Sequence, residues 1–264
     1  MKAELSYLEC AWLDPFDDDV ARAHSQYYAC EEGELLRLLE TAAPTVFAQV
    51  AHAALRDFVL REDYPCLGAR SAFRRGTYRF GAYERLDDPA VTRGLMRDLH
   101  AFAVERRGIA PDFTTFAAVF REPVPDGERG FEQALWSQLG RLHALDRTLY
   151  EWDPSVSSDP ADPNFSFSLA GTAFFVVGLH PNATRHARRF AWPALVFNAH
   201  EQFEKLRANG YFKRLQHRIR ERDVRLQGSI NANLADYGRH SEAAQYSGRE
   251  VGGDWKCPFH RNST

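Results

Sequence analysis

The residues best suited to chemistry lie at one junction, GLHPNATRHARRF (178–190). A continuous apolar run precedes His180, which predicts that a buried strand delivers this imidazole to its carboxyl end. Pro181 suits the first position of a helix, on which Arg185, Arg188 and Arg189 would cluster, with Arg185 and Arg189 on one face through their i,i+4 spacing. An imidazole beside clustered arginines could ligate iron and pair with the carboxylates of a large anionic cofactor. The same residues also suit a plain helix start with a solvated basic face.

Two cysteines and a second histidine are further ligand candidates. Cys66, in YPCLGA, lies where a loop opens a helix, and a helix N-terminus lowers the pKa of a thiol. Thiolate is an axial ligand that favours O–O cleavage, although Cys66 also suits the plainer role of a small buried thiol. His200 precedes a helical pattern and also suits a structural or capping role. Cys257 and His260 have C-x-x-H spacing, but a zinc site needs about four ligands and no second pair is present.

Signatures of several other chemistries are missing from the sequence. It has no G-x-S-x-G elbow, no Walker P-loop, no H-E-x-x-H and no G-x-G-x-x-G after a strand. Carboxylates such as Asp159 and Asp162 are plentiful, but no spacing pairs them. Hydrolysis, phosphoryl transfer and nicotinamide chemistry therefore lack their usual marks.

Composition narrows the class of protein. The net charge of −3 argues against nonspecific nucleic-acid binding, which needs a basic surface. No apolar run approaches the roughly 20 residues of a membrane span, and the first twenty residues lack the pattern of a signal peptide. The four cysteines are scattered, with no C-x-x-C pair, which favours free thiols in the reducing cytoplasm.

Hydrophobic periodicity predicts helices and strands that mix without regular βαβ alternation. We therefore expect an α+β fold, a single mixed domain in which several amphipathic helices surround a small sheet. The tail from Gly228 contains aromatic residues and is expected to pack back onto the body. Helices are expected at 45–60, 89–106, 130–147 and 199–222, the last interrupted near Gly210, and strands at 77–83, 113–120 and 165–179.

The first 43 residues differ from the remainder. They are acidic and weakly patterned, and within them GELLRLLE (33–40) has the spacing of a short helix. We expect residues 1–43 to form an N-terminal arm or cap, and residues 44–264 to form the main domain.

Five long, collinear stretches resemble the YqcI/YcgG family. Characterised members of that family include haem-dependent N-oxygenases of natural-product pathways. The resemblance implies that the protein binds haem b, activates oxygen or peroxide, and hydroxylates a nitrogen of a small guanidine-like, amino-acid or amine substrate. The stretches are 64–83 (YPCLGARSAFRRGTYRFGAY), 131–146, 159–190, 195–207 and 222–259.

If haem binds, a side chain must ligate it. The candidates are His180, Cys66, His200 and Cys257, and we favour His180 because arginines follow it at the predicted strand end. Cys66 ranks second, because thiolate suits oxygen activation. Arginines of the cluster, Arg185 and Arg189, would then pair with the haem propionates.

The implied substrate also sets expectations for the pocket. A guanidine is cationic, so a carboxylate should line the site, and Glu201 or Glu242 could serve. Arg249, in YSGR, could hold the carboxylate of an amino-acid substrate. No flavin or iron–sulfur motif is visible, so electrons would come from a separate donor or from peroxide. The apolar strands and aromatic tail are compatible with a homodimer.

Two other functions fit the same sequence. A non-catalytic haem or small-ligand binding protein would share the cofactor but would not consume oxygen with a substrate. A haem-free enzyme could use the arginine cluster to bind an anionic substrate such as a phosphate.

Overall fold

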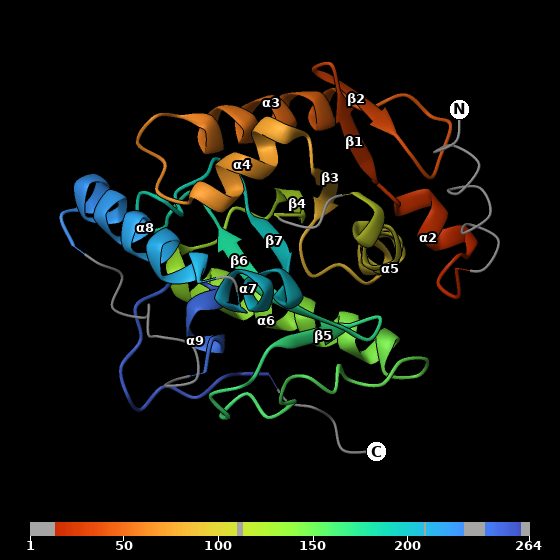
Figure 1. Cartoon of the computed structure of the whole chain (residues 1–264). Helices are drawn as coiled ribbons and strands as arrows, with labels where there is room; N and C mark the ends of the chain where they lie inside the picture. The colour runs from red at the N-terminus through yellow and green to blue at the C-terminus, as the bar shows by residue number, and fades with distance from the viewer. Residues whose placement is uncertain (1–13, 110–112, 209, 230–240, 260–264) are drawn as a thin grey trace.

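A seven-stranded mixed sheet forms the centre of the molecule in the computed structural model, which describes residues 14–109, 113–208, 210–229 and 241–259 (Figure 1). The strand order is β2-β1-β3-β4-β7-β6-β5; β3 and β4 pair in parallel, and the other neighbours are antiparallel. The strands are β1 (Tyr28–Glu31), β2 (Glu34–Arg37), β3 (Tyr78–Arg85), β4 (Thr115–Glu122), β5 (Phe167–Leu169), β6 (Thr172–Leu179) and β7 (Ala194–Ala199).

Helices cover both faces of this sheet (Figure 1). Helices α3 and α4 pack on one face, and α5 and α6 pack on the other. The described helices are α2 (Asp19–His24), α3 (Val46–Leu60), α4 (Leu67–Arg75), α5 (Pro89–Ile109), α6 (Gly127–Asp146), α7 (His200–Ala208), α8 (Tyr211–Gln227) and α9 (Ala243–Tyr246). The α+β architecture expected from the sequence is confirmed, with a larger sheet than predicted.

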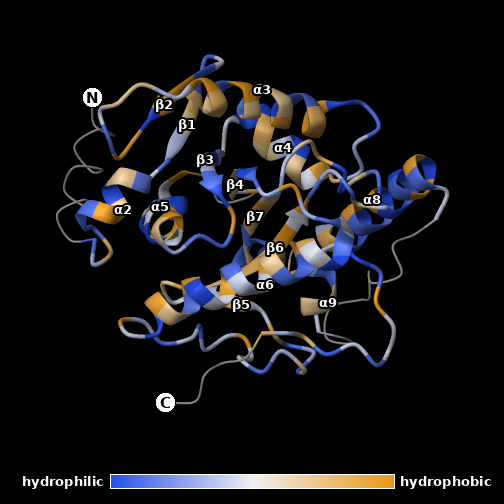
Figure 2. Ribbon diagram, turned by 180° about the vertical axis from the view of Figure 1, so that it is seen from behind, coloured by the Kyte–Doolittle hydropathy of each residue, from blue (hydrophilic) through white to orange (hydrophobic). Residues whose placement is uncertain are grey.

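Strand β4 shows how one sheet supports two cores. Phe116 and Ala118 belong to the core under α5 and α6, whereas Ala117 and Val119 belong to the core under α3. Successive side chains of a strand point to opposite faces, so a run that is apolar at every position fills both. Strands β6 and β7 are likewise largely hydrophobic, whereas α8 carries mainly hydrophilic residues (Figure 2).

The segment GELLRLLE forms a strand where the sequence predicted a helix. Residues 34–37 pair with β1, and β1 continues the sheet by pairing with β3. Glu32 and Gly33 both have positive φ, the conformation that a tight two-residue hairpin requires. This hairpin and α2, which packs on α5, make the described part of the N-terminal segment an integral edge of the fold.

Most of the other predicted elements are confirmed. The long basic helix divides into α7 and α8 at Gly210, which has a φ of +69°. The tail packs back through Tyr246 and Phe259, which are buried in the core. Within the described residues, no helix combines the length and apolarity that crossing a membrane demands.

Candidate functional site

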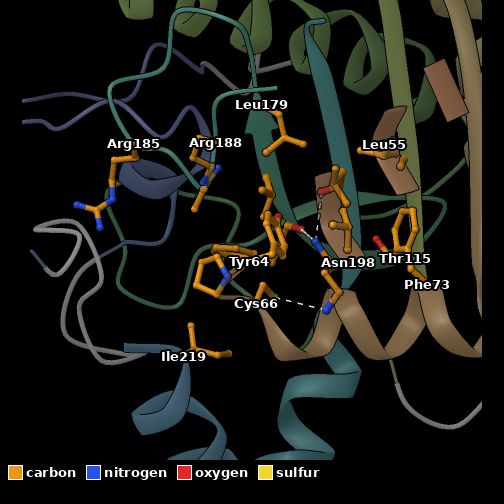
Figure 3. Close-up of a pocket in the computed structure, with 18 of the residues that line it drawn as sticks. Leu55, Tyr64, Cys66, Phe73, Thr115, Leu179, Arg185, Arg188, Asn198 and Ile219 are labelled. Carbon is orange, nitrogen blue, oxygen red and sulfur yellow. Dashed lines mark hydrogen bonds between the residues drawn. The ribbon is translucent and has the colours of Figure 1, made fainter. Parts of the chain in front are cut away.

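A largely apolar cavity of about 200 Å³ lies between the sheet, α3, α4, the loop after β6 and α8 (Figure 3). Among its polar groups are the thiol of Cys66, the guanidinium groups of Arg185 and Arg188, the carboxylate of Asp223 and the amide of Asn198. The apolar lining comes from Leu55, Val59, Phe73, Ala117, Phe175, Val177, Leu179, Val196 and Ile219.

Cys66 is held at the first turn of α4. Cys66 is the N-cap residue of α4, and its Sγ accepts a hydrogen bond from the Ala69 N–H at 3.5 Å. Burial raises the pKa of this thiol, although the N–H groups of Ala69 and Gly68 and the positive charge of Arg188 oppose the shift. The expected helix-terminus effect is therefore present but is outweighed by desolvation in the apolar cavity.

Two arginines from the loop after β6 reach the same cavity. Arg188 donates hydrogen bonds to the carbonyl oxygens of Gly178 at 2.9 Å, Gln245 at 3.1 Å and Tyr246 at 3.3 Å. Its acceptors are main-chain carbonyls, so its positive charge is not neutralised by them. Arg185 instead forms an ion pair with Asp223 of α8 at 2.5 Å.

The loop that carries these arginines is not the predicted helix. Residues 181–193 form turns, and the His180 N–H donates to the carbonyl oxygen of Arg188 at 3.0 Å, which closes the segment on itself. Arg189 is exposed and donates to the carbonyl oxygens of Ala183 and Thr184. The predicted shared face of Arg185 and Arg189 is therefore wrong, and Arg188 takes the place of Arg189 at the cavity.

His180 lies on the opposite face of the sheet from the cavity. Val177 and Leu179 line the cavity, and alternation along the chain directs His180 the other way. Its ring stacks on Phe131 of α6 with centroids 4.4 Å apart, and burial lowers its pKa to about 4. His180 is thus a neutral core histidine whose ring packs on the α6 side of the sheet, although its main chain contacts Arg188 of the cavity lining.

A family model described as the YqcI/YcgG family matches residues 55–260, which is more than half of the chain. The chain belongs to the YqcI/YcgG family. The match begins at Leu55 and includes every residue that lines the cavity, whereas β1 and β2 precede it. No curated protein and no solved structure matches the chain.

The three residues expected to serve the substrate of this YqcI/YcgG protein lie apart from the cavity. Glu201 pairs with Arg106 at 3.1 Å and with Lys205 at 2.6 Å near the start of α7. Arg249 forms an ion pair with Glu132 at 2.6 Å. Both charges therefore already have opposite partners within the fold.

Glu242, the third of these residues, is a buried residue of the tail at the start of α9. It accepts hydrogen bonds from the Ser166 hydroxyl at 2.7 Å and the Tyr246 hydroxyl at 2.6 Å. Burial raises the pKa of Glu242 to about 7. This carboxyl group joins the tail to Ser166, next to β5, and holds the Tyr246 hydroxyl that contacts Phe167 of β5 and Phe174 of β6, which is a structural role.

The two remaining ligand candidates also lie elsewhere. His200 is buried at the start of α7, where burial lowers its pKa. Cys257 is packed against the core on the α6 face, and burial raises its pKa to about 12. Of the four candidate ligands, the cavity brings Cys66 alone together with arginines within the described residues.

Sequence reasoning missed Asn198, the polar group that β7 contributes to the cavity. Its side-chain NH₂ donates to the carbonyl oxygens of Phe175 at 3.2 Å and Val196 at 3.3 Å. The amide oxygen is then the atom left to accept a hydrogen bond from a ligand. A single asparagine inside an apolar strand, LVFNA, was the signal that could have indicated this position.

Proposed function

We propose that this protein binds haem b in the cavity and hydroxylates a nitrogen of a small guanidine-like, amino-acid or amine substrate. The observation that carries the proposal is the presence of the Cys66 thiol, Arg185 and Arg188 in one apolar cavity. Thiolate is a known axial ligand of haem iron, guanidinium groups pair with carboxylates such as propionates, and an apolar lining suits a macrocycle. Bound haem would supply the activation of oxygen or peroxide.

The donor set fits haem in its chemistry, and it revises our sequence-based choice of ligand from His180 to Cys66. A buried thiol with a raised pKa must lose its proton to bind a metal. The Ala69 and Gly68 N–H groups and the positive charge of Arg188 already favour the thiolate. Arg188 is the stronger candidate for a propionate, since its acceptors in the fold are carbonyl oxygens rather than carboxylates.

Substrate recognition would fall to the polar groups of the same cavity. The Asn198 amide oxygen can accept a hydrogen bond from a substrate N–H. Asp223 supplies a carboxylate that lines the cavity itself, and its ion pair with Arg185 orients that carboxylate toward a cationic substrate. These groups replace Glu201 and Glu242 as the substrate-facing residues.

Replacement of Cys66 tests the ligand assignment. We expect wild-type protein reconstituted with hemin to bind about one haem per chain, with a ferrous carbon monoxide band at the position typical of thiolate. Cys66→Ala should lose that band or lose haem altogether, because no other thiol lines the described cavity. The measurement is an absorption spectrum of ferric, ferrous and carbon monoxide-bound protein.

His180→Ala is the matched control for this test. It removes a buried imidazole on the other face of the sheet, so the haem spectrum should persist if the variant folds. The opposite pattern, haem retained in Cys66→Ala and lost in a folded His180→Ala, would overturn the assignment to Cys66.

A non-catalytic haem-binding protein is the second candidate function. It is favoured by one observation, that Glu201, Glu242 and Arg249 do not reach the cavity. Both functions predict the same spectrum. Oxygen consumption that depends on an added guanidine or amine would distinguish them, because a carrier or sensor would show none.

A further inference from the structure

The outer face of α8 is strongly basic in a chain whose net charge is −3. We call the exposed side chains of Lys213, Arg214, Arg218 and Arg225 the α8 patch. His217 and the acidic Glu221 are the other titratable groups exposed on this face besides Tyr211. A concentration of like charge on one helix creates a local positive potential that the composition of the whole chain conceals.

The basic surface continues from α8 onto α4. The pKa of Arg70 is lowered, first by burial and then by the positive charges of Arg74 and Arg222, while the nearby carboxylates of Glu62 and Asp63 oppose the shift. Three guanidinium groups from two helices therefore lie near one another. Arg222 also donates to the carbonyl oxygens of Glu62 and Tyr64, which attaches α8 to the loop that precedes Cys66.

The α8 patch lies one helix away from the cavity. The inward face of α8 contributes Ile219 and Asp223 to the cavity lining. A helix with its side chains is about 10–12 Å across, so a partner resting on the outer face approaches the cavity closely. Tyr211 and Val224, 57% and 39% exposed, add apolar area among the charges. Tyrosine and arginine are enriched in protein–protein interfaces.

We propose that the α8 patch docks a small acidic electron-carrier protein of the iron–sulfur or flavin class. The proposal rests on the proposed oxygenase function. Hydroxylation of an amine nitrogen by dioxygen consumes two electrons and two protons: one oxygen atom enters the new N–OH group, and the other leaves as water. The reduced carrier supplies both electrons and leaves oxidised, in two encounters if it carries one electron at a time.

A protein partner fits this surface better than nucleic acid or a membrane. Nucleic acid is a long polyanion that extends beyond one helix and would meet the net negative body of the protein. A membrane-surface helix buries a broad apolar face, whereas the exposed face of α8 offers only Tyr211 and Val224. A compact acidic protein matches the patch in both size and charge.

Charge reversal on α8 tests the docking surface. The variant Arg218→Glu/Arg225→Glu changes two exposed residues of the patch, and Arg107→Glu/Arg129→Glu makes the same charge change at exposed positions on α5 and α6. The probe is an acidic plant-type [2Fe–2S] ferredoxin, with affinity measured by calorimetry at low and high salt. We expect the α8 variant to weaken binding about tenfold or more, with salt weakening the wild-type complex, because electrostatic attraction dominates it.

The control variant should change affinity by no more than about twofold, as exposed substitutions generally do. Equal loss in both variants, or no ferredoxin binding by the wild type, would overturn the proposal. Tighter binding of duplex DNA or of anionic phospholipid vesicles than of ferredoxin would replace it with a different partner. Binding is measured with and without haem, so a protein that binds ferredoxin but not haem would refute the proposed function and leave the docking surface standing.

Discussion

At the scale of single residues, alternation along β6 and β7 decides which side chains can take part in chemistry. His180 and Asn198 both lie near the ends of buried strands, yet only Asn198 faces the cavity. The strands can be predicted from the sequence. Because they are apolar on both faces, however, the pattern of polar and apolar residues does not show which face borders the cavity. The arginines that follow His180 favour it as a ligand from the sequence, whereas Asn198 is interpreted from the sequence only as a possible helix cap.

Replacement of Asn198 should separate substrate binding from haem binding. The substitution Asn198→Leu removes the acceptor oxygen and keeps a side chain of similar size. We therefore expect haem content to be retained and the KM for an amine or guanidine substrate to rise. A hydrogen bond to a charged group contributes about 1.5–3 kcal/mol, which corresponds to roughly ten- to a hundredfold in KM. Steady-state kinetics with quantified haem measure this.

A second variant, Asn198→Asp, tests whether the orientation of the side chain matters. A carboxylate cannot donate to the carbonyl oxygens of Phe175 and Val196, so the orientation that frees the amide oxygen is lost. An unchanged KM in both variants would show that Asn198 does not contact substrate.

At the scale of elements, the sequence predicted correctly those helices whose amphipathic pattern lies within a single segment. The helices α3, α5 and α6 follow apolar spacing that each segment carries by itself. GELLRLLE has leucines at helical spacing, but pairing with β1 and the positive φ of Gly33 determine a strand. The loop after His180 likewise takes its shape from contacts of Arg188 with β6 and the tail, which no local pattern reveals.

The docking of the tail is predicted to depend on pH through Glu242. Its pKa is about 7 in the fold, mainly because of burial, against an ordinary value of 4.5. A raised pKa means that the folded state holds the proton more tightly, so the free energy of unfolding is highest below about pH 4.5 as far as Glu242 is concerned. This contribution falls as pH rises to about 7, by on the order of 3 kcal/mol, and then levels off.

Glu242→Gln isolates this effect, because glutamine keeps the size of the side chain and does not titrate. We expect the difference in melting temperature between Glu242→Gln and the wild type to grow in favour of the variant from pH 5 to pH 7.5. Other buried carboxyls, such as Asp98 with a pKa of about 6, titrate in both proteins and cancel in the comparison. A constant difference across this range would contradict a buried, titrating Glu242.

At the scale of the whole molecule, the cavity is assembled from segments that are far apart in the chain. Its lining extends from Leu55 in α3 through the central strands to Asp223 in α8. Sequence motifs identified several of these segments singly, and the family resemblance linked them to one function. Which side chains meet was decided by the strand order, with β7 inserted between β4 and β6.

The cavity is small for the proposed haem, and we expect α8 to be the element that moves to admit it. A volume of about 200 Å³ is below the roughly 300–1,000 Å³ of typical cofactor sites. In α8 only Asp223 is buried, so this helix is held mainly by polar contacts, among them those of Arg222 with Glu62 and Tyr64. An element with few buried apolar contacts opens at low cost.

Arg222→Ala should therefore accelerate haem uptake. Loss of hydrogen bonds from a charged donor, about 1.5–3 kcal/mol, would increase the population of the open state and raise the rate of hemin association about tenfold. Arg218→Ala, on the exposed face of the same helix, is the matched control and should leave the rate unchanged. Stopped-flow absorption after mixing with hemin gives both rates. A rate in Arg222→Ala equal to that of the control would mean that haem enters without displacing α8, and that another wall of the cavity opens.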